Sequence, residues 1–98
     1  MYIAHFQDHP GTLHLRRSHA DDHAAYLAQH RDTIAGETHR FCDDLGNPYG
    51  AMWLINTTER RVALSLCHDD PYWKLGVRKD VTLVRWMPSP YDLRVAHA

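Results

Sequence analysis

The pattern of apolar and polar positions divides the chain into short elements. Residues 2–8 alternate, with Tyr2, Ala4 and Phe6 on one side, and they end at an Asp-His-Pro-Gly turn, so they predict a first strand. Residues 12–31 lack Gly and Pro and are rich in Leu, Ala, Arg and Gln, which favours one long helix. The first third of the chain is therefore predicted to be a strand followed by a helix.

The rest of the pattern adds two strands, a helix and a last strand. Residues 33–42 mix apolar and β-branched residues before an Asp-Asp-Leu-Gly-Asn-Pro loop, so they predict a second strand. Residues 50–57 contain a continuous apolar run, which suits a strand buried on both faces. Residues 58–67 carry apolar positions at helical spacing, and residues 80–87 alternate again before two prolines.

The resulting order, β-α-β-β-α-β, predicts an α+β domain with a ferredoxin-like plait. A chain of 98 residues has room for one domain, which we assign to residues 1–88, and we assign residues 89–98 to a C-terminal tail. Two helices can cover only one face of a four-stranded sheet, yet residues 50–57 are apolar on both sides. We therefore expect a second copy of the chain to cover the open face, which gives a homodimer.

Composition narrows the class of partner. The 11 basic and 12 acidic residues give a net charge of −1 without a basic block, so we expect neither nucleic acid nor a membrane surface as a partner. No apolar segment is long enough to span a bilayer or to form a signal peptide, and Cys42 and Cys67 lie in no paired motif. A reducing cytoplasm fits best. The chain has no glycine-rich phosphate loop, and we expect no cofactor.

Three histidines share one face of the predicted first helix. At about 100° per residue, His19, His23 and His30 fall within roughly 40° of one another in the middle of the apolar stripe. A desolvated imidazole favours its neutral form, which is able to accept a proton as a general base. Two alternatives stay open: the rings are packing residues bonded to backbone, or His19 and His23 bind a metal with a third ligand such as His5 or His39.

The second local signal is an Asp-Asp-Pro-Tyr sequence at residues 69–72. Asp70 is predicted to cap a short helix, Pro71 to be its first residue and Gly76 to end it. Capping and catalysis are compatible, because a carboxylate at a helix start that also contacts an imidazole fixes the tautomer of that ring and stabilises its charged form.

These motifs resemble those of the YCII family. Arg-Arg-Ser-His at residues 16–19 resembles the Arg-x-x-His segment of the family's first helix, and residues 69–72 with Gly76 resemble its Asp-Pro-Tyr box. The chain departs from the family pattern at Ala20, where Leu is common, and at Glu37, where Pro is common. The resemblance implies a dimeric α+β barrel in the fold group of the muconolactone isomerases. It also implies a His-Asp dyad and, for one branch of the family, removal of HCl from a chlorinated hydroxyhydroquinone.

We therefore expect a cofactor-free lyase, a dehydrochlorinase of small hydroxylated aromatic or quinonoid compounds. The expected base is His19, oriented by Asp70, and the expected substrate-binding residues are Arg16, His5 and Tyr72; we expect no metal. The alternatives are an isomerase similar to muconolactone isomerase, a dimeric module that binds a small ligand without catalysis, and a metalloprotein.

Overall fold

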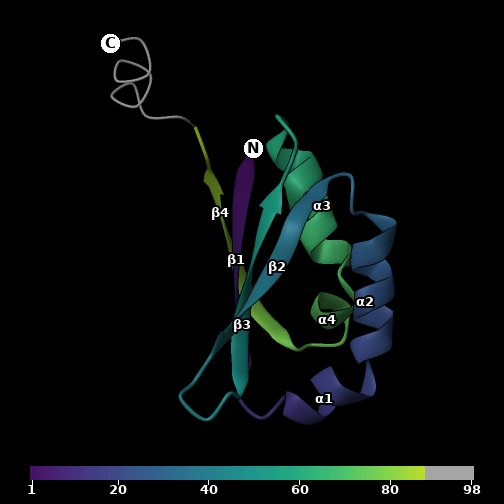
Figure 1. Ribbon diagram of the computed structural model, residues 1–98, viewed down its shortest axis with the longest axis vertical. Coiled ribbons are helices and arrows are strands. Elements are labelled where there is room, and N and C mark those ends of the chain that lie inside the picture. The colour runs from purple at the N-terminus through teal and green to yellow at the C-terminus, as the bar shows by residue number, and fades with distance from the viewer. Residues whose placement is uncertain (88–98) are drawn as a thin grey trace.

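The computed structural model describes residues 1–87, with side chains described for all of these except residues 36–38 (Figure 1). The predicted tail lies outside the described residues. The elements are β1 (Tyr2–Asp8), α1 (Leu13–Ser18), α2 (Ala20–Gln29), β2 (Ile34–Cys42), β3 (Pro48–Ile55), α3 (Arg60–Asp69), α4 (Pro71–Lys74) and β4 (Arg78–Arg85).

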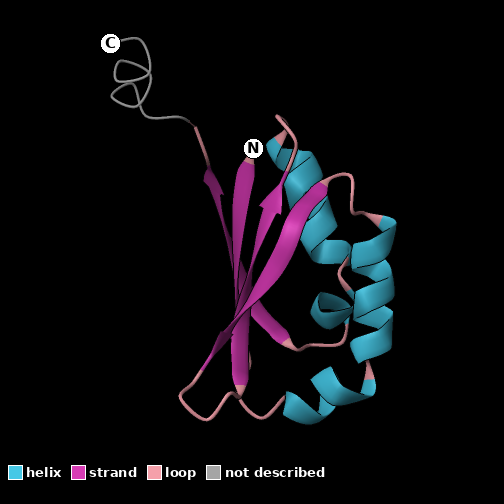
Figure 2. Ribbon diagram, viewed as in Figure 1, coloured by secondary structure: helices cyan, strands magenta, loops and turns pink. Residues whose placement is uncertain are grey.

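The strands form one antiparallel sheet in the order β2-β3-β1-β4, so β1 lies between β3 and β4. Figure 2 shows the helices gathered on one face of this sheet. The arrangement is the predicted α+β ferredoxin-like plait. Among the described residues no helix is long and apolar enough to cross a membrane.

The predicted first helix is two helices that meet at His19. His19 has φ −118° and ψ 19°, outside the helical range, although its N–H still bonds to the carbonyl of Leu15 at 3.0 Å. Figure 1 shows α1 across one end of the sheet and α2 running along its face. Composition could not reveal this break, because the segment contains no Gly or Pro. The rotation calculated for one continuous helix therefore fails beyond His19.

The bounds of the last long helix and of the last strand differ from the predicted bounds. The helix predicted at residues 58–67 is α3, which begins at Arg60 and ends at Asp69, two residues later at each end. The strand predicted at residues 80–87 is β4, which begins and ends two residues earlier. Glu59 stands at the N-cap of α3, but its side chain makes no capping hydrogen bond; its own N–H donates to Thr57 Oγ1 at 3.1 Å. The predicted element types are unaffected.

The core lies between the helices and one face of the sheet. Phe6 of β1 and Trp53 of β3 are fully buried there, and their rings meet edge to face with centroids 4.6 Å apart. Ala63 and Cys67 of α3 complete the layer above them. The alternation of β1 also turns Asp8 toward this side, so a carboxylate is buried at the end of the same row.

The opposite face of the sheet is open among the described residues. Ile3, Leu54 and Val84 are paired across β1, β3 and β4 and form an apolar row on this face. Val84 is 53% exposed and Trp86, just beyond β4, is 51% exposed. A partner that covers the sheet would therefore bind to this open face.

Candidate active site

The site begins at α4, whose first residues follow the local rules for a helix start. The side chain of Asp70 accepts a hydrogen bond from the N–H of Tyr72 at 3.2 Å, Pro71 is the first helical residue, and Gly76 has φ +80°. The predicted cap is thus present. Asp70 is also fully buried, which is unusual for a capping carboxylate and indicates further partners.

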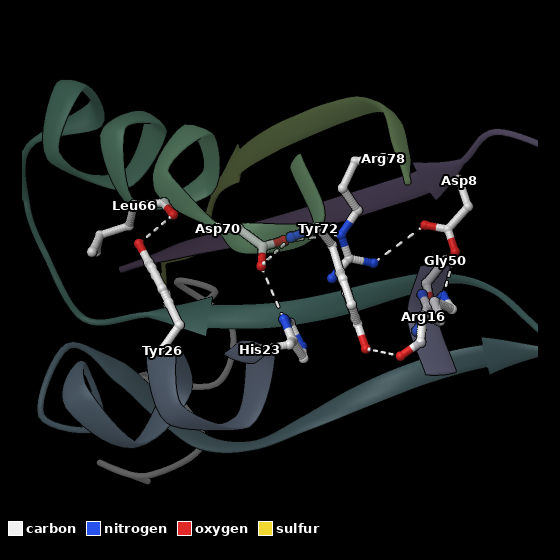
Figure 3. Close-up of polar contacts among 9 residues, drawn as sticks. All are labelled: Asp8, Arg16, His23, Tyr26, Gly50, Leu66, Asp70, Tyr72 and Arg78. Atoms are coloured by element: carbon white, nitrogen blue, oxygen red, sulfur yellow. Dashed lines mark hydrogen bonds and ion pairs between the residues drawn. The ribbon is translucent and has the colours of Figure 1, made fainter. Parts of the chain in front are cut away.

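The imidazole that contacts Asp70 belongs to His23 of α2 (Figure 3). His23 Nδ1 lies 2.9 Å from Asp70 Oδ1, and the His23 side chain is 17% exposed. The expected contact between His19 and Asp70 is absent: His19 Nδ1 instead lies 3.2 Å from Asp22 Oδ2 on an exposed part of α2. His23, one helical turn beyond the junction of α1 and α2, is therefore the histidine that faces α4.

Behind this pair lies a chain of buried ion pairs. Asp70 Oδ2 accepts from Arg78 Nε at 3.1 Å, and Arg78 Nη1 donates to Asp8 Oδ1 at 3.2 Å. Asp8 Oδ2 in turn accepts from Arg16 Nε at 2.7 Å, and Arg16 Nη2 reaches the carbonyl of Gly50 at 3.4 Å. Two carboxylates and two guanidinium groups alternate along the chain. Each buried charge is therefore compensated, which is the condition for keeping such groups out of water.

Tyr72 connects the two ends of this chain. Its ring stacks on the His23 ring, with centroids 4.1 Å apart and planes 12° from parallel, and its hydroxyl donates to the carbonyl of Arg16 at 2.9 Å. The Arg16 and Arg78 guanidinium carbons each lie 5.2 Å from the Tyr72 ring centroid. Burial raises the pKa of the Tyr72 hydroxyl above its ordinary value, so the group stays protonated and remains a donor.

A cavity of about 510 Å³ opens beside the His23–Asp70 pair. This volume is within the range of pockets that hold small organic molecules. Residues of α1, α2, β2, β3, α4 and β4 line it, and its wall includes Arg16, His23, Leu27, Trp53, Tyr72 and Arg78.

The structure brings together three of the five site residues predicted from sequence. Asp70, Arg16 and Tyr72 belong to one connected cluster. His19 does not line the cavity, and neither does His5. The odd positions of β1 face the open side of the sheet, and the ring of His5 contacts Phe41 there, with centroids 4.8 Å apart.

Sequence analysis missed the roles of Asp8 and Arg78 in this cluster. The alternation of β1 was sufficient to place Asp8 on the side of Phe6, since both are even-numbered positions of one strand. No local signal marks Arg78, because its two partners lie 8 and 70 residues away.

No group of three or more His, Cys, Asp or Glu side chains that could hold a metal ion occurs in the described part of the chain. His23, one of the two histidines considered as metal ligands, bonds to Asp70, and the other, His19, to Asp22.

Comparison with known proteins shows a likeness to a solved structure. No family model matches the sequence, and no curated protein matches it. Among solved structures, the chain is similar to 5-chloro-2-hydroxyhydroquinone dehydrochlorinase from Burkholderia phenoliruptrix in complex with 2,5-dihydroxybenzoquinone. The TM-score is 0.77 and the identity 21%, over 93% of this chain and 98% of that chain. At this identity the likeness establishes the ferredoxin-like α+β fold, and membership of the YCII family stays a prediction.

Proposed function

We propose that this chain is a dehydrochlorinase, a lyase that acts on a small chlorinated and hydroxylated aromatic or quinonoid compound without a cofactor. The observation that carries the proposal is the contact of 2.9 Å between His23 and Asp70 at the wall of a cavity of about 510 Å³. The shared fold with a dehydrochlorinase of a hydroxyhydroquinone supports the choice of substrate class.

The geometry gives the two residues different roles. Carboxylate oxygens only accept hydrogen bonds, so in the Asp70 contact a neutral His23 donates from Nδ1. Its Nε2 is then the unprotonated nitrogen and is able to take a proton from a ligand. Asp70 is a positioning residue: it fixes the tautomer and balances the charge that appears on the ring. The stacked Tyr72 fixes the plane of the imidazole.

Loss of HCl from such a ring needs no nucleophile and no oxidant. In the first step His23 moves the proton of one hydroxyl to the chlorine-bearing carbon, and the O–H electron pair becomes a carbonyl. In the second step His23 takes the proton of another hydroxyl, a second carbonyl forms, and the C–Cl electron pair leaves as chloride. The ring has then lost one proton and one chloride and has become a quinone. Arg16, in the cavity wall, is the residue we propose to stabilise oxyanion charge.

The test is release of chloride from 5-chloro-2-hydroxyhydroquinone by His23→Gln. Removal of a general base costs about 10²- to 10⁴-fold in kcat, and we expect a loss in that range. His14→Gln is the matched control, because His14 is an exposed residue of α1 outside the cavity wall. Undiminished turnover in a folded His23→Gln protein would remove the pair from the mechanism.

Two alternatives share this geometry. An isomerase similar to muconolactone isomerase would return the proton to another carbon of the substrate without loss of chloride. A binding module would use the cavity alone, with the ion pairs serving only the fold. Product analysis with the wild-type protein distinguishes the three: chloride with a quinone, a rearranged isomer, or unchanged ligand.

We further propose that two copies of the chain pair through their open sheet faces. The registered positions of β1, β3 and β4 on this face include Ile3, Leu54 and Val84, and Asp80 is the one Asp, Glu, Lys or Arg among them. A nearly uncharged face meets its own copy without like-charge repulsion, as a two-fold interface requires. Sedimentation should report a dimer for the wild-type protein and a monomer for Val84→Glu; a wild-type monomer at all concentrations contradicts the pairing.

A further inference from the structure

Two buried N–H groups of residues that line the cavity have no hydrogen-bond partner among the described residues. They are Trp53 Nε1 and Arg78 Nη2. Trp53 is fully buried, and the side chain of Arg78 is fully buried as well. A buried donor without a partner is uncommon in a folded protein and calls for a reason, such as a ligand that supplies the acceptor.

The Arg78 donor is fixed in position by the ion pairs described above. Asp70 holds Nε and Asp8 holds Nη1, so the guanidinium plane is set, and Nη2 is the nitrogen that has no partner among the described residues. Figure 3 shows that this third nitrogen carries neither of the two dashed contacts to the carboxylates. The Trp53 ring is likewise immobilised, since it packs against Phe6 in the core. Both donors are therefore preorganised.

The charged side chains of the described residues that line the cavity are all positive. Four arginines line it, namely Arg16, Arg17, Arg40 and Arg78, and no described residue that lines it is Asp or Glu. The carboxylates that neutralise the two buried arginines belong to the chain of ion pairs behind the wall. Arg17 and Arg40 are exposed and add positive charge toward solvent. Such a lining attracts anions and repels cations.

We infer that the cavity binds its ring ligand as an oxyanion, with an ionised ring oxygen accepting from Trp53 Nε1–H and Arg78 Nη2–H. This inference rests on the proposed function and names the ionisation state of its ligand. Hydrogen bonds to a charged acceptor are about twice as strong as those to a neutral one, so the pair selects the anionic form.

The test compares two ring ligands of similar size by calorimetry. One is 2,5-dihydroxybenzoquinone, whose hydroxyls are vinylogous acids that ionise below neutral pH, and the other is hydroquinone, which is neutral at pH 7. We expect the anion to bind about tenfold more tightly or better to the wild-type protein. Trp53→Phe keeps most of the ring and removes the donor, so it should weaken the anion about tenfold and hydroquinone less than about threefold. Trp73→Phe is the matched control, because Trp73 does not line the cavity.

A second measurement needs no substitution in the core. In the wild-type protein, the indole N–H resonance of Trp53 should move downfield when 2,5-dihydroxybenzoquinone binds, and that of Trp73 should not. The resonances are assigned with Trp73→Phe, which changes a partly buried residue at the edge of the core, and with Trp86→Phe, which changes an exposed one.

The outcomes separate this inference from the proposed function. An unmoved Trp53 resonance at saturation, or equal affinity for the two ligands, overturns the oxyanion subsite while chloride release still supports the dehydrochlorinase. Binding of the anion with the expected selectivity but without any chloride release supports the subsite and removes the proposed reaction. Absence of both binding and turnover overturns both.

Discussion

The two faces of the sheet differ in burial and in charge, although residues that are adjacent in sequence form them. Leu83 and Val84 are adjacent in β4, yet Leu83 is packed under the helices and Val84 is half exposed on the open face. The helix face also buries four charged side chains, whereas the described paired positions of β1, β3 and β4 on the open face include one charged residue, Asp80. A buried ion pair is weak evidence for stability, because desolvation offsets much of the attraction. Charges kept inside a small domain at that cost point to a function for the helix face and to packing for the open face.

The largest effect should come from breaking the buried chain of charges. Asp70→Ala leaves Arg78 without one of its two carboxylates and removes the cap of α4. Loss of one partner of a buried pair costs about 3 to 5 kcal/mol, which is a large part of the free energy of unfolding of a domain this size. Urea denaturation measures the loss.

The control for that experiment is the preceding residue. Asp69→Ala removes an exposed carboxylate and should change the free energy of unfolding by less than about 0.5 kcal/mol. Equal effects of the two substitutions would mean that the buried charges are not coupled as the contacts indicate.

The two adjacent residues of β4 offer the most direct test of the comparison. Leu83→Ala should lower the free energy of unfolding by about 2 to 4 kcal/mol, because it opens a gap in the core. Val84→Ala should cost less than about 1 kcal/mol in dilute protein. If the open faces pair, the cost of Val84→Ala should grow with protein concentration, since dimerisation adds to the stability of the folded state. Thermal unfolding at several concentrations checks both expectations.

Local rules predicted the part of the site that depends on neighbours in sequence. The cap by Asp70, the start of α4 at Pro71 and its end at Gly76 follow from side-chain chemistry within seven residues. The alternation of β1 likewise grouped Tyr2, Ala4 and Phe6 on one side, and this is the side that faces the core.

The pairing of the imidazole could not be predicted in the same way. It depends on the backbone angle at His19, where the helix breaks without a Gly or Pro, and on the distance between α2 and α4 in the folded chain. The ion pair between Asp8 and Arg78 joins residues 70 positions apart, and no pattern within one element reveals it.

A smaller effect is expected from the hydroxyl of Tyr72. Tyr72→Phe keeps the ring stacked on His23 but removes the bond to the carbonyl of Arg16. We expect a loss of about 1 kcal/mol in the free energy of unfolding, together with a change of less than about tenfold in kcat, because the imidazole keeps its carboxylate partner. A loss of kcat as large as that of His23→Gln would instead mean that the hydroxyl acts on the substrate.

The last prediction concerns the two cysteines, because the rate at which a thiol is labelled reports its burial without a change to the packing of the protein. Cys67 lies in the helix-side core, where burial raises the pKa of its thiol from 9.0 to about 12, while Cys42 is exposed. The thiolate is the reactive form, so at pH 8 a thiol reagent should label Cys42 rapidly and Cys67 only as the protein unfolds.

Cys42→Ser should remove the rapid phase of labelling and leave the slow phase of Cys67.

The raised pKa of Cys67 also determines the direction in which the stability of the protein changes with pH. The folded state keeps the Cys67 proton more tightly than the unfolded chain, so its contribution to stability is complete below about pH 9 and is lost as the pH rises toward 12. Rapid labelling of both thiols at pH 8 would mean that the helix side opens far more readily than its packing indicates.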